Sequence, residues 1–208
     1  MSIREAYNKW ADQYDSNLNL TRDLEAIALR SELKDYQFEN SLEVGCGTGK
    51  NTEFLLTKTN NHTAVDLSEE MLAIAKSKIA ASSVKYFQAD INEPWNFAHD
   101  FFDLVTFSLV LEHVENLDEV FRKLAHHTRI GAHVYIGELH PFKQYTGSKA
   151  RFETSDGLQI VSCFNHHISD FTNSAKKHGF TIVSINEYFD EDKSVLIPRI
   201  LTLLFKKN

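Results

Sequence analysis

The chain of 208 residues is long enough for one compact domain that buries roughly 70% of the surface its unfolded form would expose, which disfavours a two-domain enzyme. Apolar residues make up 42% and charged residues 25%, which excludes a disordered, collagen-like or disulfide-stapled protein. The formal net charge is −7; residues 1–104 hold 10 Lys and Arg against 17 Asp and Glu, whereas residues 105–208 balance at 12 and 12. A nucleic-acid partner would need a basic surface, and we therefore expect none.

No segment resembles a membrane helix or an export signal. The longest uninterrupted apolar or weakly polar run, residues 104–111, falls far short of the ~20 residues that a membrane helix needs. The first ten residues contain no apolar stretch typical of a secretory signal. We therefore expect a cytoplasmic protein with no membrane partner. Cys46 and Cys163 lie far apart and form no CxxC pair, so neither a disulfide framework nor a cysteine zinc site is indicated.

Helical spacing marks the first forty residues, and alternating strands and helices follow. Tyr7, Trp10 and Tyr14 recur at i, i+3 and i+7, and residues 23–36 are good helix formers. After residue 40, strands are predicted at 41–44, 62–65, 84–88, 102–107 and 132–139, with helices at 51–58, from 68 onwards and at about 117–127. Strands separated by helices need crossover connections, which indicates a mostly parallel sheet with helices on both faces.

This alternation is interrupted at residues 140–168, which mix aromatic, basic and histidine residues over an unusually long connection. A helix at 169–178 follows and is closed by Gly179. Strands at 181–188 and 200–206 lie close enough in sequence to form an antiparallel hairpin. We predict a single α/β domain over residues 1–208, with a Rossmann-like, doubly wound, seven-stranded sheet that is mostly parallel and has an antiparallel last strand. Residues 1–40 would form a helical lid, and the 140–168 insert would cover a substrate site.

Ligands of doubly wound sheets bind at the carboxyl ends of the strands, so the predicted strand ends indicate where a site should lie. The residues at these ends are Gly45, Gly47, Gly49, Asp66, Asp90 and Ser108. Glycines allow a sharp turn and the close approach of a ligand. Asp66 lies 21 residues after Gly45, close to the spacing at which an acidic side chain accepts hydrogen bonds from ribose hydroxyls. Together these residues indicate an adenosine-type ligand.

The spacing of the glycines narrows the choice of ligand. A dinucleotide fingerprint, G-x-G-x-x-G, would place its third glycine at position 50, where this chain has Lys50. The pattern here is E-x-G-x-G-x-G, from Glu43 to Gly49. At this motif the sequence resembles the class I S-adenosylmethionine-dependent methyltransferases, in the small-molecule group called methyltransferase type 11 or 25. Five motifs carry the resemblance in order, at residues 7–15, 42–49, 65–72, 89–91 and 108–114.

The resemblance implies S-adenosylmethionine as the cofactor and S-adenosylhomocysteine as its product. The backbone of residues 45–47 would pass close to the methionine part of the cofactor, Asp66 would hold the ribose hydroxyls, and Glu43 would orient the glycine loop. At the adenine, Leu67 and Met71 would pack on the ring while residues 90 and 91 would read its edge. The implied cofactor-binding set is Trp10, Tyr14, Glu43, Gly45, Cys46, Gly47, Gly49, Asp66, Leu67, Met71, Asp90, Ile91 and Ser108. Trp10 and Tyr14 would belong to the lid, with simple core packing as the alternative.

Methyl transfer from a sulfonium is an in-line displacement whose donor is already activated, so positioning the acceptor supplies much of the rate. Where the acceptor is a hydroxyl or a protonated amine, a histidine base would assist. We expect this role of His140, after the fifth strand, or of His166 and His167, at the close of the insert. A turn-fixing role is the alternative for His140, and since no carboxylate spacing supports a site of three histidines, no metal is predicted. Residues 112 and 113 are expected to form a hydrogen-bond network at a helix entry.

Two classes of acceptor are disfavoured. The chain lacks the Pro-Pro pair that related nucleobase amino-methyltransferases carry after the fourth strand, and neither cysteine has the nearby proline that cytosine C5 methylation would need. We therefore expect a small-molecule acceptor, contacted by Tyr145, Arg151, Phe152 and Phe164. The methylated atom, whether O, N, S or C, and the oligomeric state stay open.

Two other functions also remain open at this stage. One is a catalytically silent cofactor-binding protein that acts through a partner, which would carry the same motifs. The other is an NAD-dependent oxidoreductase, against which the glycine spacing counts.

Overall fold

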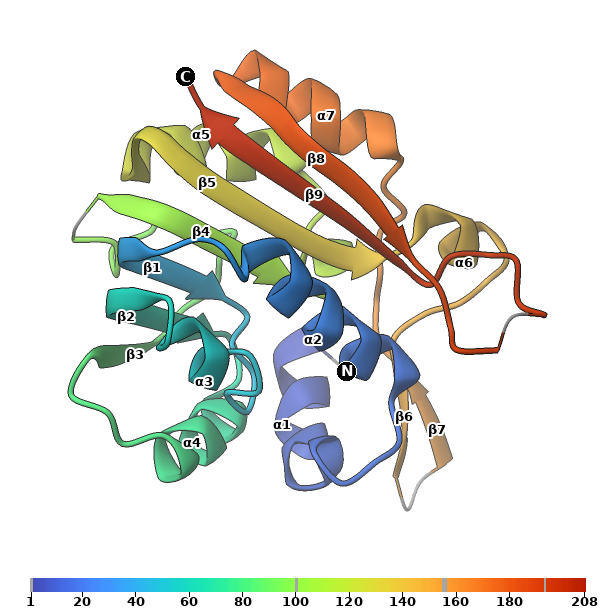
Figure 1. Cartoon of the computed structure of the whole chain (residues 1–208). Helices are drawn as coiled ribbons and strands as arrows, with labels where there is room; N and C mark the ends of the chain where they lie inside the picture. Colours follow the sequence, from blue (N-terminus) through green and yellow to red (C-terminus); the bar gives the residue numbers. More distant parts are fainter. Residues whose placement is uncertain (1, 100, 155–156, 193) are drawn as a thin grey trace.

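The computed structural model of the chain describes residues 2–99, 101–154, 157–192 and 194–208. Its centre is a seven-stranded sheet in the order β3-β2-β1-β4-β5-β9-β8 (Figure 1). The strands are β1 (Phe38–Val44), β2 (Thr59–Asp66), β3 (Val84–Gln88), β4 (Phe102–Ser108), β5 (Thr128–Leu139), β8 (Phe180–Tyr188) and β9 (Ile200–Lys207). β1 to β5 pair in parallel, and β9 runs antiparallel to both β5 and β8. The predicted Rossmann-like, doubly wound sheet with its antiparallel last strand is thereby confirmed.

Helices cover both faces because the central strands are apolar on both sides. Along β4, Leu104 points to one face while Val105 and Phe107 belong to the core on the other, as the period of two requires. α5 (Leu117–His127) and α7 (Ile168–Lys177) cover the second face. α2 (Leu20–Leu33) and α3 (Thr52–Leu55) cover the first (Figure 1). None of the helices in the described part of the chain combines the length and apolar character needed to cross a bilayer.

The strand register brings the expected strand ends to one edge of the sheet. Val44 of β1 pairs with Val65 of β2 and with Phe107 of β4. The segments that follow these three strands therefore begin side by side. α4 (Glu69–Lys78) continues from β2, capped by the Ser68 hydroxyl, which accepts from the Met71 amide at 3.1 Å.

β1 and β2 begin three residues earlier than the sequence pattern predicts. The extra residues include asparagines, which have low strand propensity and so concealed the strands. In the structure these side chains pair across the strands: Asn61 Nδ2 donates to Asn40 Oδ1 at 3.1 Å, and Asn60 Nδ2 donates to Glu39 Oε2 at 2.7 Å. The early start of β2 leaves α3 only four residues, against the predicted helix over 51–58.

The 140–168 insert contains elements that the sequence pattern did not predict. α6 (Pro141–Tyr145) follows β5 directly, and β6 (Arg151–Thr154) pairs antiparallel with β7 (Gly157–Ile160) as a separate two-stranded sheet. Ala150 and Val161, at the base of this hairpin, pack in one cluster with Trp10 of α1 (Ile3–Tyr14). The insert and the N-terminal helix therefore lie against each other, on the same side of the molecule (Figure 1).

Polar contacts hold α1 over the strand ends. The Thr48 hydroxyl donates to Asp15 Oδ1 at 2.6 Å, and the Ser68 hydroxyl donates to Asn8 Oδ1 at 2.6 Å. The N-terminus of the helix is closed by a capping box between Ser2 and Glu5. These contacts hold α1 in the position that we expect of a lid.

Candidate active site

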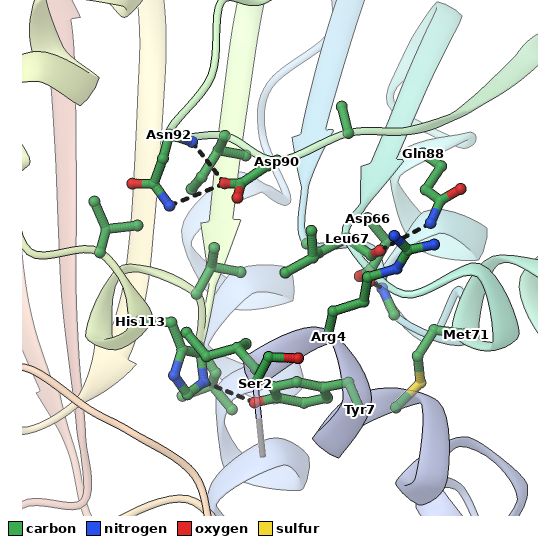
Figure 2. Close-up of a pocket in the computed structure, with 18 of the residues that line it drawn as sticks. Ser2, Arg4, Tyr7, Asp66, Leu67, Met71, Gln88, Asp90, Asn92 and His113 are labelled. Carbon is green, nitrogen blue, oxygen red and sulfur yellow. Dashed lines mark hydrogen bonds between the residues drawn. The ribbon is translucent and has the colours of Figure 1, made fainter.

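A cavity of about 690 Å³ lies at the carboxyl ends of β1 to β4, beneath α1 (Figure 2). Figure 2 shows Asp90 and Asn92 at one end, Asp66, Leu67 and Gln88 along one side, and Tyr7 with His113 at the other end. Nine of the expected cofactor residues line this cavity: Tyr14, Gly45, Gly47, Asp66, Leu67, Met71, Asp90, Ile91 and Ser108. The structure thus brings together residues that lie up to 94 positions apart in the sequence, from Tyr14 to Ser108.

The glycine loop turns away from β1 and leaves free space at one position. The Gly45 and Cys46 amides donate to the Val65 carbonyl at 2.7 and 3.0 Å, and the Gly47 amide donates to Asp66 Oδ2 at 2.8 Å. A Cβ built on Gly45 would lie 2.1 Å from Val110 Cγ2, so this glycine is required by packing. A Cβ built on Gly47, which has φ +53°, would meet no described protein atom within 4 Å. Gly47 therefore faces space that a ligand can fill.

Gly47→Val is expected to abolish binding of S-adenosylhomocysteine while the protein stays folded. A branched side chain would occupy the cavity wall, whereas a non-glycine residue at this positive φ costs only about 1–2 kcal/mol of stability. Isothermal titration calorimetry and thermal unfolding measure the two effects separately. Gly179→Val is the matched control, because Gly179 also has a positive φ and open space around its Cβ position but does not line the cavity. If Gly47→Val bound the ligand normally, the cofactor would not pass this loop.

Asp66 ties the glycine loop to the start of α4. Its Oδ2 accepts from the Gly47 amide and its Oδ1 accepts from the Ser68 amide, both at 2.8 Å. Removal from bulk water raises the pKa of Asp66 to about 6, although both hydrogen bonds oppose this rise. The carboxyl group thus forms part of the cavity wall in a defined orientation. Hydrogen bonds from ligand hydroxyls would stabilise its ionised form, because they would replace the water that burial removes.

The opposite end of the cavity is a turn held in place by a buried lysine. Asp90 Oδ1 accepts from the amide and the side-chain Nδ2 of Asn92 at 2.8 and 2.9 Å. Lys123 of α5 donates from Nζ to the carbonyls of residues 91, 92 and 93 at 2.8, 2.7 and 2.8 Å. Lys123 therefore fixes the segment that would read the adenine edge, and no motif in the sequence indicated this role.

Three expected cofactor residues support the glycine loop without lining the cavity. Glu43 is buried, and its Oε2 accepts from the Thr52 hydroxyl at 2.5 Å and lies 3.1 Å from His62 Nε2. Cys46 packs with Ala64 and Leu72, and burial raises the pKa of its thiol well above the usual value. Gly49 is the third, since a Cβ there would lie 3.0 Å from Ile79 Cδ1. Glu43 contacts α3 and β2 on either side of the loop, and its role in orienting the loop stays a prediction.

A second cavity, of about 780 Å³, adjoins the first. Both cavities are lined by Tyr7, Tyr14 and Leu109. The second cavity is lined further by Trp10, by residues 17–21 in the α1–α2 connection and the start of α2, and by residues 146–151 of the insert. The aromatic stripe of α1 therefore packs in a core cluster and also forms the wall between two cavities, so neither of the two interpretations of this stripe excludes the other.

The three histidines expected to act on the acceptor are not among the described residues that line either cavity, and each has a partner elsewhere in the fold. His140 caps α6: its Nδ1 accepts from the Phe142 amide at 3.1 Å, and its Nε2 lies 2.9 Å from Glu187 Oε1. His166 is buried, with Nε2 2.7 Å from the Val114 carbonyl.

The third histidine, His167, precedes α7, and its Nδ1 lies 2.6 Å from the Tyr145 hydroxyl. Over the described ranges, the histidine nitrogens, cysteine sulfurs and carboxylate oxygens that come together in a set of three, within 4.8 Å of one another, belong to Glu112, His113 and Cys163.

A different histidine stands where the cavities meet. His113 Nε2 lies 2.8 Å from the Tyr7 hydroxyl (Figure 2), and its Nδ1 lies 2.9 Å from the Ser162 carbonyl. A carbonyl oxygen only accepts, so Nδ1 carries the ring proton, Nε2 is the acceptor and the Tyr7 hydroxyl donates to it. Glu112 Oε1 lies 3.9 Å from the same Nε2. Of the two residues expected to form a hydrogen-bond network, His113 makes these two contacts, and its position at the first cavity was not foreseen.

Of the residues expected to contact the acceptor, one lines the second cavity. Arg151 lines the second cavity. Tyr145 and Phe164 are not among its lining residues as far as the structure describes the chain. The side chain of Phe152 lies outside what the structure describes.

Comparison with known proteins assigns the fold and the motifs to a family. The profile of a methyltransferase domain family matches residues 42–136. The chain is 31% identical over 176 residues to a malonyl-[acyl-carrier protein] O-methyltransferase of Bacillus cereus, covering 77% of this chain and 64% of the relative. A protein of the same name from Bacillus anthracis is 29% identical over 133 residues, covering 62% of this chain and 49% of the relative. The chain therefore spans about half to two thirds of the length of these relatives.

A solved S-adenosylmethionine-dependent methyltransferase structure from Clostridium acetobutylicum superposes with a TM-score of 0.72 at 20% identity, covering 98% of this chain and 99% of the other. At that identity the likeness concerns the fold. The family profile spans the glycine loop, Asp66 and Asp90, which are the residues that the cavity brings together. Together the profile match, the curated relatives and this superposition support a class I S-adenosylmethionine-dependent methyltransferase of the group defined by this methyltransferase domain.

Proposed function

We propose that this protein is an enzyme that transfers the methyl group of S-adenosylmethionine to a small acceptor held in the second cavity. The observation that carries the proposal is the adjacency of two cavities of about 690 and 780 Å³ that share the walls formed by Tyr7, Tyr14 and Leu109. Both volumes are in the range of sites for small molecules and cofactors. One cavity holds the family's cofactor motifs, which leaves the other for the acceptor.

The residues of the first cavity fit the cofactor. Gly47 leaves space beside the backbone, Asp66 presents a carboxyl group with an acceptor capacity beyond its two amide bonds, and Asp90 stands at the far end. When bound, S-adenosylmethionine supplies a methyl group on a sulfonium sulfur, which a nucleophile can displace in line. The protein must then position the acceptor and, where the nucleophile carries a proton, remove that proton.

Tyr7 and His113 can remove that proton. Burial raises the pKa of Tyr7 well above its usual value, so the phenol stays neutral and acts as a relay. In this step the acceptor O–H or N–H proton passes to Tyr7 Oη while the Tyr7 proton passes to His113 Nε2. The carboxyl group of Glu112, 3.9 Å from Nε2, can stabilise the resulting imidazolium when ionised.

A ligand panel tests the cofactor part of the proposal. S-adenosylhomocysteine at about 100-fold over its Kd is expected to stabilise the folded protein by roughly 2.7 kcal/mol, whereas NAD should leave the thermal unfolding midpoint unchanged. The reason is that the glycine spacing and Asp90 fit the sulfur ligand. Stabilisation by NAD alone would overturn the assignment.

A second panel tests catalysis. Candidate small acceptors are incubated with isotope-labelled S-adenosylmethionine, and methylated products are detected by mass. Methylated product supports the enzyme. Binding of S-adenosylhomocysteine without any methylated product over a broad panel would favour the catalytically silent protein that acts through a partner.

A further inference from the structure

The second cavity is cationic although the chain as a whole is acidic. The net charge of the chain is −7. Three cationic side chains line this cavity, those of Lys149, Arg151 and Arg199, and among its described lining residues Glu112 is the single acidic one. Burial raises the pKa of Glu112 above its usual value. A cavity of one sign of charge attracts ligands of the opposite sign.

The three cations differ in how much of their charge is available. The charge of Arg199 is paired within the protein, because its Nη2 donates to Asp190 Oδ2 at 2.8 Å. Its Nη1 donates to the Thr21 hydroxyl at 3.2 Å. Lys149 and Arg151 are exposed, and neither takes part in an ion pair among the residues that the structure describes. Within the described part of the chain, no carboxylate pairs with these two charges, so they can serve a ligand.

The fold anchors these two charges beside the cavity. Between them, Ala150 packs in the cluster that contains Trp10, and its carbonyl accepts from the Val161 amide at 3.0 Å. Arg151 is the first residue of β6, and Lys149 lies just before this strand, so both flank an anchor that packs next to α1. An ammonium group and a guanidinium two residues apart suit a carboxylate or phosphoryl group, because arginine binds such groups in a bidentate manner.

We propose that the acceptor is an anion, and that Lys149 and Arg151 bind its carboxylate or phosphoryl group while its reacting atom lies towards Tyr7 and Leu109. This inference rests on the proposed function, since it assigns the second cavity to the acceptor. It makes these two side chains determinants of substrate specificity. The insert is then the part of the chain that selects the substrate class.

Calorimetry on the complex with S-adenosylhomocysteine tests the inference with three small probes. Malonate and inorganic phosphate carry the two kinds of anionic group, and malonamide is the neutral counterpart of malonate. At least one anion is expected to bind, and malonamide is expected to bind at least tenfold more weakly. The anion that binds with the lower Kd shows whether the site prefers a carboxylate or a phosphoryl group.

Two double variants identify the residues responsible. Lys149→Gln with Arg151→Gln is expected to weaken binding of the anion by about 10- to 100-fold, since each removes a hydrogen bond between charged groups. Lys85→Gln with Arg129→Gln is the control: it makes the same change in net charge with two exposed cations that do not line the cavity. It should leave anion affinity within about twofold, and both variants should bind S-adenosylhomocysteine as the wild type does.

Several outcomes would overturn the inference: neither anion binds, malonamide binds as tightly as malonate, or the two double variants behave alike. Failure of the proposed function would look different. It would show as absence of methylated product from the acceptor panel, irrespective of anion binding. Methylation of neutral acceptors in preference to acids would keep the function and refute the anionic acceptor.

Discussion

His113→Ala is expected to lower acceptor turnover by about 10²–10⁴-fold, the usual contribution of a general base. The variant removes the nitrogen that accepts the Tyr7 proton, so the acceptor would have to lose its proton to water. The affinity for S-adenosylhomocysteine should change by less than tenfold, because the glycine loop, Asp66 and Asp90 are untouched. Turnover is measured as product mass against time, with an acceptor found by the panel.

Two further variants separate chemistry from structure. Tyr7→Phe keeps the aromatic ring in its cluster and removes only the hydroxyl, so it should reproduce most of the loss if the relay operates. His126→Ala removes an exposed histidine of α5 and should turn over normally. Added imidazole should partly restore His113→Ala, which a purely structural role would not allow. Normal turnover in His113→Ala and Tyr7→Phe would mean that the enzyme works by proximity alone.

Asp66→Ala is expected to raise the Kd for S-adenosylhomocysteine by about 10²–10⁴-fold, because two hydrogen bonds to a charged acceptor are lost at ~1.5–3 kcal/mol each. Without ligand, the variant loses the acceptors of the Gly47 and Ser68 amides and also loses a buried carboxyl group. These two effects oppose each other, so the protein should stay folded. Titration calorimetry and thermal unfolding check both parts.

The affinity for S-adenosylhomocysteine should also depend on pH through Asp66. Burial raises the pKa of this carboxyl from 3.8 to about 6 in the ligand-free protein. The ionised form is the better acceptor for two hydroxyls, so the Kd should rise by up to tenfold per pH unit below about pH 6. Asp66→Asn should lack this pH dependence. Wild-type affinity in Asp66→Ala, or an equal pH slope in Asp66→Asn, would mean that the ribose is held elsewhere.

The raised pKa of Asp66 affects the stability of the ligand-free protein in the opposite direction: low pH weakens ligand binding but favours folding. A pKa above the unfolded value means that the folded protein binds this proton more tightly than the unfolded chain does. Asp66 therefore favours folding at low pH, and this contribution is lost as pH rises from about 4 to about 6. The carboxyl that serves the cofactor is thus a source of instability when the cavity holds no ligand.

The features that could be predicted from the sequence are those with a local cause. Apolar runs alternating with helical segments predicted the parallel sheet, and glycines or an acidic residue directly after a strand predicted a ligand edge, because parallel strands bring their carboxyl ends together. The E-x-G-x-G-x-G spacing further distinguished the family from dinucleotide-binding proteins. The cofactor cavity could therefore be outlined from Gly45, Gly47, Asp66 and Asp90 alone.

The tertiary structure decided which polar side chains are free to act, because a histidine's role depends on partners that come from distant parts of the chain. His140 meets Glu187, 47 positions away, and His166 meets the Val114 carbonyl, 52 positions away, so two plausible bases are committed to holding the fold. His113 meets Tyr7 across 106 positions, at the junction of two cavities. No spacing within one segment records such contacts, which arise only when the lid, the insert and the sheet edge pack together.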